Sequence, residues 1–500
     1  MIGSVLIANR GEIAVRIVRG ARECGIRTIA VHSEADRLAP HVLEADEAYE
    51  IGPAPSSESY LRSDRLIELA KRVGAEAIHP GYGFLAERAD FARAVEEAGL
   101  VFVGPRADTI AAMGDKTEAR RRMAAAGVPI VPGLTEAVAD PAEAERAAEE
   151  IGFPVLLKAS AGGGGKGMRV VSGRGELRRA FEAASREAMA AFGDGSVYLE
   201  RYLARPRHVE IQVLGDAHGN VVHLAERECS IQRRHQKLVE EAPSPVLTPD
   251  ERARMGETAV RAAEAVDYRG AGTVEFLYEK GEFWFLEMNT RLQVEHPVTE
   301  LVTGIDLVEW QFRVASGEKL PFAQQDILLR GHAIECRITS EDHLGGFLPS
   351  TGVVTQLEIP SGPGVRWDGG IVQGTEVALH YDPLLAKLIV HAPTRAAAIA
   401  RMRRALGELV IAGVETCAPF HLRVMDEPDF ASGDFCIRYL EEHPALLEPE
   451  EAGAETAAAA IAAALLEDEH RRHRAPRIGA EGSVPMSAWR RGGSPAPGSP

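Results

Sequence analysis

The chain has 500 residues, enough for about three domains at roughly 150 residues each. Apolar residues make up 45% and charged residues 26%, as in ordinary globular proteins. The formal net charge of −18 argues against nucleic acid as a partner. No apolar run approaches the ~20 residues of a membrane span, the N-terminus reads as a strand and not as a signal peptide, and the five cysteines are scattered without a CxxC pair. We therefore expect a cytoplasmic protein that binds no membrane.

The first part of the chain alternates strands and helices, which is typical of βαβ units and a parallel sheet. The first turn reads Asn9-Arg10-Gly11-Glu12 and lacks the glycine fingerprint of dinucleotide-binding proteins. We expect strands at 5–8, 27–32, 75–79 and 100–103, and helices at 12–24, 60–73 and 88–98.

The region from about 131 to 203 reads as a small α/β module with one mobile loop. Beyond Glu448 the composition shifts to an Ala-rich helix at 454–466, and then to a Gly/Ser/Pro end that we expect to be disordered. We expect strands at 154–158, 209–214, 221–225, 273–278 and 283–288, further short strands between 331 and 390, and a helix at 395–406.

A glycine run, Ala161-Gly-Gly-Gly-Gly-Lys-Gly-Met168, follows the strand that ends in Lys158. Successive glycines let backbone N–H groups wrap around phosphate oxygens, and the neighbouring lysines supply positive charge. Gly167 stands where a Walker A loop has Ser or Thr, so the run is not that motif. A flexible linker is the alternative, which the position directly after a buried strand disfavours.

Two glutamates face each other in a hairpin predicted over 273–289. If Lys280-Gly281-Glu282 forms the loop, Glu275 lies opposite Glu287, and Asn289 shares the face of Glu287. Carboxylates ~4 Å apart repel each other by up to ~4 kcal/mol at an effective dielectric of about 20, unless a cation lies between them. Two oxygen ligands together with phosphate oxygens suit Mg²⁺. The alternative is a solvated face, which the neighbouring aromatic residues disfavour.

The segment Arg291-Leu-Gln-Val-Glu-His-Pro297 carries polar residues at alternate positions. In extended form Arg291, Gln293 and Glu295 would point one way, and the two apolar residues between them the other. Arginine supplies a planar fork suited to a carboxylate-like anion, and Glu295 would lie close enough to act as a base on it. Taken alone, the segment favours a surface ion pair, worth under ~1 kcal/mol.

Positive charge gathers in Gln232-Arg-Arg-His-Gln-Lys237, a segment too short to indicate nucleic-acid binding in an acidic protein. With Arg201, Arg205, Arg207 and His208 it offers the local positive charge that anionic substrates need.

Apolar residues alternate inward along the predicted strand Ala333–Thr339, which leaves Glu335 and Arg337 on the opposite face. From spacing alone, Arg337 fits a structural salt bridge. Cys229 and Cys336 are expected in the core, because no neighbouring His or carboxylate suggests an activated thiol.

Several long motifs, in the right order, resemble the biotin carboxylase family over residues 1–446, and together they are far more specific than any one alone. They are Ile7-Ala-Asn-Arg-Gly-Glu-Ile-Ala-Val-Arg-Ile17, His79-Pro-Gly-Tyr-Gly-Phe-Leu-Ala-Glu87, Gly162-Gly-Gly-Gly-Lys-Gly-Met168, Gln232–Lys237 and Glu287-Met-Asn-Thr-Arg-Leu-Gln-Val-Glu-His296.

The resemblance implies an ATP-grasp fold, α/β in class with an α+β arrangement overall. A Rossmann-like N-terminal domain would span 1–115 and an ATP-grasp domain 116–330, with a mobile lid at about 131–203. A C-terminal mixed domain would span 331–446, followed by the tail at 447–500. The implied enzyme is an ATP-dependent ligase.

The resemblance also implies the site residues. Mg²⁺ or Mn²⁺ would be held by Glu275, Glu287 and Asn289, and biotin would meet Tyr82 and Arg337, which displaces the salt-bridge interpretation of Arg337. Bicarbonate would bind Lys237, Arg291, Gln293 and Val294, with Glu295 as its base; Lys237, Arg291, Glu295 and Arg337 would be the catalytic residues. ATP would bind at Lys116, Lys158, Gly164, Gly165, Glu200, Arg201, Tyr202, Leu203, His208, His235, Glu275 and Glu287.

The implied partners are a biotin carboxyl carrier protein, carboxyltransferase subunits and a second copy of the chain. Arg16, Arg19, Glu23 and Arg366 match the family's dimer interface, although Pro363 stands where some members have an aromatic residue. No Met-Lys-Met occurs, so biotin is expected on a separate carrier. The tail includes Ser487-Ala-Trp-Arg-Arg491, which resembles a segment that precedes further domains in fused acyl-CoA carboxylases. It is either a docking element or a dispensable end.

The implied reaction is the first half-reaction of an acyl-CoA carboxylase, with acetyl-CoA, and hence fatty acid biosynthesis, as the expected route. Propionyl-CoA, pyruvate and 2-oxoglutarate carboxylases are alternatives that share this subunit type. A different ATP-grasp ligase would share the metal and ATP residues but would have no reason to combine Tyr82, Glu295 and Arg337. A non-catalytic scaffold is disfavoured by the complete set of charged site residues.

Overall fold

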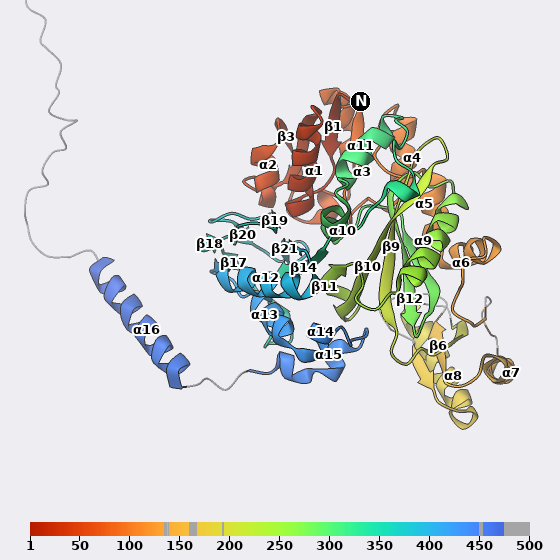
Figure 1. Cartoon of the computed structure of the whole chain (residues 1–500). Helices are drawn as coiled ribbons and strands as arrows, with labels where there is room; N and C mark the ends of the chain where they lie inside the picture. The colour runs from red at the N-terminus through yellow and green to blue at the C-terminus, as the bar shows by residue number, and fades with distance from the viewer. Residues whose placement is uncertain (135–137, 139, 160–167, 193–194, 450–453, 475–500) are drawn as a thin grey trace, which may run out of the picture. The chain divides into compact units, whose positions relative to one another are not determined.

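The computed structural model describes residues 1–134, 138, 140–159, 168–192, 195–449 and 454–474 (Figure 1). It contains two compact units, Met1–Leu447 and Glu448–Pro500. In the second unit the described residues include one helix, α16 (Ala454–Arg474), which confirms the predicted Ala-rich helix and extends it. The Gly/Ser/Pro end and most of the glycine run lie outside the described residues. Among the described helices, none is both long and apolar enough to cross a membrane.

A parallel sheet of five strands, in the order β3-β2-β1-β4-β5, begins the first unit (red to orange in Figure 1). Strand β1 (Ser4–Ile7) is buried along its whole length, and α1 (Gly11–Glu23) packs Ile13 and Ile17 beneath the sheet, as the helical spacing predicted. Strand β3 (Glu47–Gly52) was not predicted, because Ile51 is its one buried residue and it lacks an apolar pattern. The other elements are β2 (Arg27–Ser33), β4 (Ala77–His79), β5 (Val101–Phe102), α2 (Pro40–Glu44), α3 (Ser63–Val73) and α4 (Ala89–Glu97).

The carboxyl ends of β1 and β4 meet at one edge of this sheet, where α/β proteins bind ligands. The side-chain amide of Asn9 donates to the carbonyl oxygens of Pro80 and Tyr82, both at 2.7 Å. Gly81 lies between these acceptors at φ 64°, and a Cβ atom there would come within 2.9 Å of Asn9 Nδ2. The glycine therefore allows the close approach that fixes Tyr82 at the sheet edge.

An eight-stranded antiparallel sheet follows, in the order β13-β12-β9-β10-β11-β14-β21-β19 (green to blue in Figure 1). Its strands are longer than predicted, β10 (Val221–Arg233) most of all, and β9 (Arg207–Gly215) extends the predicted strand at both ends. All residues of β9 are buried, so both faces of the sheet are covered there and charged side chains lie inside the protein. The other strands are β11 (Gln236–Ala242), β12 (Gly270–Glu279), β13 (Glu282–Asn289), β14 (His332–Thr339), β19 (Val365–Gly369) and β21 (Leu384–Ala392).

Helices cover this sheet on its apolar sides. Helix α9 (Pro249–Glu264) begins with a capping box between Thr248 and Glu251 and packs against β9 and β10. Helices α12 (Arg395–Glu408) and α13 (Ala418–Asp426) pack against β14, whose Ile334, Cys336 and Ile338 lie in the core as predicted. Cys229 is also fully buried. The remaining helices next to the sheet are α10 (His296–Thr303) and α11 (Leu307–Ala315).

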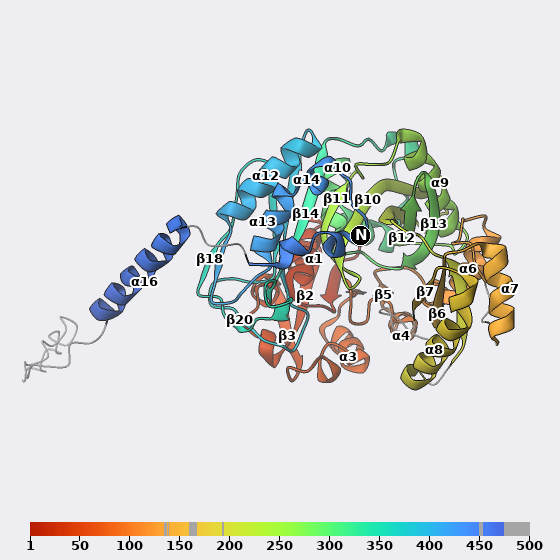
Figure 2. The same cartoon turned by 90° about the horizontal axis from the view of Figure 1, so that it is seen from below.

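A small three-stranded sheet, β7-β6-β8, lies within the region predicted as a lid. Both views show it beside α7 and α8 (yellow in Figures 1 and 2). Its apolar core includes Leu157, Leu177 and Leu199. The elements are β6 (Val155–Ala159), β7 (Arg169–Val171), β8 (Val197–Arg201), α7 (Pro141–Ile151) and α8 (Arg174–Phe192), preceded by α5 (Ala107–Gly114) and α6 (Lys116–Ala125).

Short strands and helices complete the first unit, and those strands that lie between 331 and 390 confirm the short strands predicted there. They are β15 (Glu341–Asp342), β16 (Leu348–Pro349), β17 (Gly352–Val353), β18 (Gln356–Glu358), β20 (Glu376–Val377), β22 (Val410–Ala412), α14 (Pro428–Ser432) and α15 (Tyr439–Glu442).

Candidate active site

One large cavity, of about 1390 Å³, lies within the first unit. Its lining residues come from three sheets and their loops: the N-terminal sheet, the eight-stranded sheet and the β6–β8 sheet. Gly164 and Gly165 fall outside the described residues. Every other predicted site residue lines the cavity: Tyr82, Lys116, Lys158, Glu200, Arg201, Tyr202, Leu203, His208, His235, Lys237, Glu275, Glu287, Asn289, Arg291, Gln293, Val294, Glu295 and Arg337.

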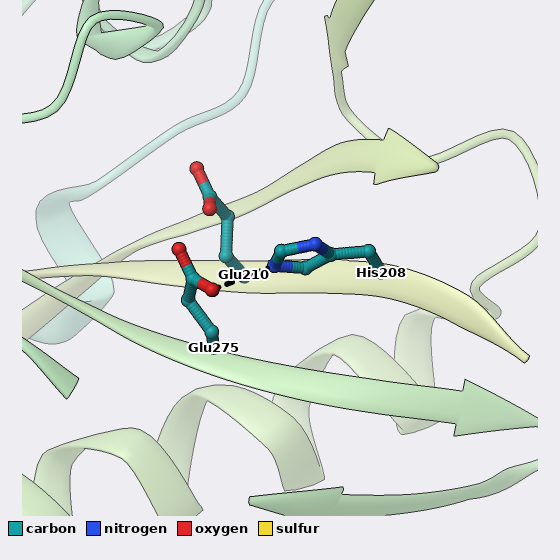
Figure 3. A group of neighbouring side chains, drawn as sticks. All are labelled: His208, Glu210 and Glu275. Carbon is teal, nitrogen blue, oxygen red and sulfur yellow. Dashed lines mark ion pairs between the residues drawn. The ribbon is translucent and has the colours of Figure 1, made fainter. Parts of the chain in front are cut away.

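Three glutamates form a row across neighbouring strands of the eight-stranded sheet. Glu275 on β12 pairs with Glu287 on β13 on one side and with Glu210 on β9 on the other. Figure 3 shows Glu210 and Glu275 with His208, which shares a strand face with Glu210. Directly opposite residues project from the same face of a sheet, so three carboxylates point together. The sequence missed Glu210, although its alternation with His208 was a signal for it.

The predicted pairing of Glu275 with Glu287 is confirmed, but the predicted loop was wrong. The turn consists of Lys280 and Gly281 alone, at φ 53° and 87°, and Glu282 already belongs to β13. A two-residue turn would shift the register by one residue, but a β-bulge before Glu287 shifts it back. The bulge therefore puts Glu287 opposite Glu275.

Glu275 collects more donors than its neighbours in the row. Its Oε1 accepts from Lys237 at 2.9 Å, Asn289 at 3.0 Å and Gln293 at 2.8 Å, and its Oε2 lies 2.9 Å from His208 Nε2. Burial would raise the pKa of Glu275, but Lys237 and His208 outweigh burial and hold it well below its ordinary value. Burial would lower the pKa of His208, and Glu275 reverses that shift. Glu275 is therefore an anion at neutral pH.

Glu287 differs, because burial and the charge of Glu275 both raise its pKa. A divalent cation would relieve this repulsion, and the donor set of two carboxylates with the Asn289 amide oxygen suits a hard ion such as Mg²⁺. In the structure that amide oxygen accepts from Arg291 Nη2 at 2.9 Å, so Asn289 would have to release it to bind the ion. Glu210, like Glu275, already has a cation on each oxygen, so either carboxylate would have to loosen one of these contacts to bind an ion.

Lys237 lies at the centre of a buried carboxylate cluster. Its Nζ donates to Glu210 at 2.5 Å, to Glu275 at 2.9 Å and to Glu295 at 2.7 Å. Burial would lower the pKa of this lysine, but the three carboxylates hold it well above its ordinary value. The ammonium group thus joins the cross-strand row to Glu295.

Glu295 lies between two cations. Lys237 contacts one of its oxygens, and Arg337 Nη2 donates to the other at 3.0 Å. Burial would raise its pKa, but these two cations outweigh burial and hold it well below its ordinary value. Arg337 also donates through Nε to Glu240 at 2.5 Å. The salt-bridge and site interpretations of Arg337 are thus both compatible with the geometry, since one guanidinium spans a structural carboxylate and a cavity carboxylate.

The expectation that Arg291–Glu295 is extended was wrong. The segment is a loop that turns at Val294 and Glu295 into α10. The polar side chains still gather in the cavity, because Leu292 is fully buried in the core and Lys387 Nζ donates to the Val294 carbonyl oxygen at 2.8 Å. Arg291 pairs with Glu87 at 2.9 Å, a cavity residue that the spacing could not reveal.

Glu200 lies at the other end of the cavity, between two cations. Lys158 forms an ion pair with it, and Arg120 Nη1 donates to it at 2.7 Å. Arg120, which sequence analysis missed, also lines the cavity. Leu156 and Tyr198 add apolar wall there, so this end combines positive charge with a surface suited to a flat ring.

The predicted basic cluster is divided between the cavity and the rest of the surface. Arg234 and His235 form the β10–β11 turn at φ 50° and 68° and line the cavity. Arg233 instead stacks over Phe347, 4.7 Å from the ring centroid. Two further predicted contributors, Arg205 and Arg207, do not line the cavity and pair elsewhere, with Asp434 and Glu442 and with Glu228, respectively.

Among the residues predicted at a dimer interface, Arg16 and Arg366 meet within the chain at Glu300, at 2.8 and 2.7 Å. Arg19 pairs with Glu44 at 2.8 Å. Glu23 and Pro363 are exposed. The contact with a second copy stays a prediction.

Three family models match in chain order. The biotin carboxylase N-terminal domain matches residues 1–110, the ATP-binding domain of the carbamoyl-phosphate synthase L chain matches 115–323, and the biotin carboxylase C-terminal domain matches 335–442. Together with the fold, these matches define the class as an ATP-grasp enzyme, an ATP-dependent ligase.

The chain belongs to the biotin carboxylase family: it is 54% identical over 443 residues to the biotin carboxylase of Haemophilus influenzae, covering 88% of this chain and 99% of that protein. Subunit alpha of the mitochondrial methylcrotonoyl-CoA carboxylase of Glycine max is 49% identical over 482 residues, covering 94% of this chain and 66% of that protein. The biotin carboxylase domain dimer of the Hydrogenobacter thermophilus 2-oxoglutarate carboxylase, solved with MgADP, ADP and bicarbonate, has a TM-score of 0.83 and 52% identity, covering 90% of this chain and 100% of that chain. This chain is therefore the biotin carboxylase component of a biotin-dependent carboxylase.

Proposed function

We propose that the protein uses ATP and bicarbonate to transfer a carboxyl group to biotin on a separate carrier protein, and that this reaction takes place in the cavity. The arrangement of Glu295 supports this most directly, because an ionised carboxylate between Lys237 and Arg337 is a base placed beside cations that attract an anion. When the bicarbonate anion binds beside these cations, its negative charge offsets part of their positive charge. The pKa of Glu295 then rises, and Glu295 becomes a stronger base. Substrate binding would thereby activate the base.

Bicarbonate would bind between Lys237, Arg291 and Gln293, with the Val294 backbone alongside. Glu295 removes its proton, and the resulting oxygen nucleophile attacks the γ-phosphate of ATP, giving ADP and carboxyphosphate. The cations that line the cavity stabilise the charge on the transferring phosphoryl group. Mg²⁺ or Mn²⁺, held by Glu275, Glu287 and Asn289, would supply further charge neutralisation on the phosphates.

Carboxyphosphate then breaks into carbon dioxide and phosphate inside the cavity. The phosphate takes the N1 proton of biotin, and the biotin nitrogen attacks carbon dioxide. Arg337 would stabilise the enolate form of the biotin ureido group, and Tyr82, held by a hydrogen bond to Glu12, would form the wall against which biotin lies. Water must be excluded, because it would hydrolyse the intermediate.

ATP would occupy the end of the cavity around Lys116, Lys158 and Glu200, with His208 and His235 towards the phosphates. The proposed organisation is a Rossmann-like domain at 1–115, an ATP-grasp domain at 116–330 and a C-terminal domain at 331–446. The segment at about 131–203 would act as a lid over the nucleotide, with Gly164 and Gly165 on the phosphates.

The proposed partners are a biotin carboxyl carrier protein, carboxyltransferase subunits and a second copy of the chain, in the cytoplasm. All five cysteines are free, which suits a reducing compartment. We propose an acyl-CoA as the final acceptor of the carboxyl group. Acetyl-CoA, and with it a role in fatty acid biosynthesis, is the acceptor expected from the sequence. Supporting this, the match to the methylcrotonoyl-CoA carboxylase subunit covers 94% of this chain and so extends beyond Met1–Leu447, whereas that to the Haemophilus protein covers 88%.

Pyruvate and 2-oxoglutarate are the competing acceptors. Identification of the carboxyltransferase that co-purifies with the native protein decides among these and the acyl-CoA.

Removal of the chain after Glu448 tests the tail. We expect unchanged activity on free biotin but weaker association with the carrier or the carboxyltransferase. Unchanged association would mean that the tail is dispensable for docking.

Bicarbonate-dependent ATP cleavage, measured as ADP release, tests the reaction. The rate should rise when free biotin is added and rise further with a biotinylated carrier protein. Equal rates with and without biotin at saturating bicarbonate would point to a different ATP-grasp ligase, and the absence of any ATP cleavage to a non-catalytic subunit.

A further inference from the structure

A fully buried arginine, Arg227, lies behind the cavity on β10 and is absent from its lining. A guanidinium has five N–H donors, and all five of these find acceptors. Nε donates to Glu210 Oε1 at 2.5 Å; Nη1 donates to Gln212 Oε1 at 2.6 Å and Thr299 Oγ1 at 3.0 Å; Nη2 donates to Thr273 Oγ1 at 3.0 Å and Gln293 Oε1 at 2.8 Å.

Arg227 continues the cross-strand row of glutamates. It lies directly opposite Glu210 in the β9–β10 register, so the row runs Glu287, Glu275, Glu210 and Arg227 over four neighbouring strands. The buried charges at this end of the row therefore form a pair. A lysine could supply the charge but not the planar fork that reaches acceptors on both sides at once.

The contact with Gln293 decides which way its side-chain amide points. Arg227 occupies the amide oxygen, and the amide nitrogen donates to Glu275 at 2.8 Å. In the reversed orientation two donors would face each other at Arg227, and two acceptors would face each other at Glu275. The guanidinium therefore holds the Gln293 N–H group towards the carboxylate side of the cavity.

The contact with Glu210 acts on Lys237 in the same way. Arg227 holds one oxygen of Glu210, and Lys237 binds the other at 2.5 Å. Glu210 is buried completely, so its side chain has no solvent into which it could turn. Arg227 thus fixes the carboxylate that holds the ammonium group beside Glu295.

We infer that Arg227 is a positioning residue for the anion site, which orients the Gln293 amide and the Lys237 ammonium before bicarbonate binds. This inference rests on the proposed function, because it assigns Arg227 a role in binding the same substrate. It requires Arg227 to act on bicarbonate, and not on ATP, whose proposed site lies towards Lys158 and Glu200.

The test is steady-state ATP cleavage by Arg227→Lys, which keeps a positive charge beside Glu210 but loses the fork. We expect the KM for bicarbonate to rise at least about tenfold, equivalent to about 1.4 kcal/mol, while the KM for ATP changes less than about twofold. The matched control is Arg252→Lys. Arg252 also makes a forked contact with a buried glutamate of β10, Glu226, at 2.7 Å, but does not line the cavity or reach Gln293. The Arg252→Lys variant should leave the KM for bicarbonate and the KM for ATP unchanged.

Combination with Gln293→Ala separates positioning from a general loss of structure. If Arg227 acts largely through Gln293, adding Arg227→Lys to Gln293→Ala should raise the bicarbonate KM much less than it does in the unmodified protein. A wild-type bicarbonate KM in Arg227→Lys, equal rises in both KM values, or fully multiplicative effects would overturn the inference.

Should Arg227→Lys fail to fold, the crystal structure of the unmodified protein with bicarbonate provides the test. We expect the Gln293 nitrogen on the anion and its oxygen still on Arg227; an amide turned the other way, or a bound anion out of reach of both Gln293 and Lys237, would overturn the inference. An unmodified protein without bicarbonate-dependent ATP cleavage would instead refute the proposed function, so the two failures are distinguishable.

Discussion

Replacement of Lys237 by methionine tests the electrostatics of the site. The Lys237 side chain is 10% exposed and contacts three carboxylates at 2.5, 2.9 and 2.7 Å. Methionine fills a similar volume but leaves Glu210, Glu275 and Glu295 without their shared cation. Removal of one partner from a buried ion pair costs about 3–5 kcal/mol. Because the unfolding entropy is ~2.1 cal/mol/K per residue, 1 kcal/mol corresponds to about 1 °C for the unit Met1–Leu447, and the melting temperature should fall by roughly 3–5 °C.

The loss should depend on pH, and its sign is fixed. Without the lysine, the pKa values of the three carboxylates rise. Uptake of a proton by one of them then reduces their mutual repulsion and stabilises the folded protein. Proton uptake costs less at lower pH, so Lys237→Met should be more destabilising at about pH 8 than at about pH 6, by up to ~1.4 kcal/mol per pH unit for one proton. Differential scanning fluorimetry at both pH values measures this, with Lys319→Met, an exposed lysine, as the control. An equal loss at both pH values, or a loss no larger than that of the control, would refute the reasoning.

Three further predictions follow from individual residues. Glu287→Gln should abolish turnover and keep the melting temperature within a few degrees, because it removes one of two facing carboxylates; wild-type activity at low Mg²⁺ would show that the metal lies elsewhere. Arg337→Ala should retain ATP binding, measured by calorimetry, but lower biotin carboxylation by roughly 10²–10³-fold, since one charge-stabilising donor is lost; unchanged carboxylation would contradict its role. Burial lowers the pKa of His41 to about 4 from an unfolded value near 6.5, so the unfolded chain binds the proton first as pH falls. The free energy of unfolding therefore falls as the pH drops from 6.5 to 4. The substitution His41→Gln removes this loss, so its effect on the free energy of unfolding should be about 2 kcal/mol more favourable at pH 5 than at pH 7.5. Urea denaturation at both pH values measures the difference.

Much of the fold could be predicted from apolar periodicity. The strand and helix alternation of the N-terminal sheet was visible because strands such as β1 are buried on both faces. The edge strand β3 was not visible, since it buries one side chain. Strand β10 was predicted to end at Ala225 because charged residues begin at Glu226, yet the strand continues to Arg233. Glu226, Arg227 and Glu228 are buried and paired, with Arg252 of α9 and with Glu210 and Arg207 of β9, respectively, so polarity did not mark the end of the strand.

For the same physical reason, several residues of the site could not be predicted from the sequence. Residues in recognisable motifs were found, and those that the structure describes line one cavity. Glu210, Arg227 and Glu240 were missed, because a charged residue in a strand is ordinarily on the solvated face. In the opposite direction, Arg205 and Arg207 were expected to supply the cavity with charge but pair with carboxylates away from it. Sequence spacing gives the face of a strand but not the partner across it.

We propose that this cavity transfers a carboxyl group from bicarbonate to biotin. Incubation of the purified chain with [¹⁴C]bicarbonate, MgATP and a biotinylated carrier protein, followed by rapid gel filtration, measures this directly. We predict label on the carrier in a one-to-one ratio with the ADP formed, and none with Glu295→Gln or without ATP. Label that does not depend on ATP, or ADP formed with biotin present but without label on the carrier, would contradict the account.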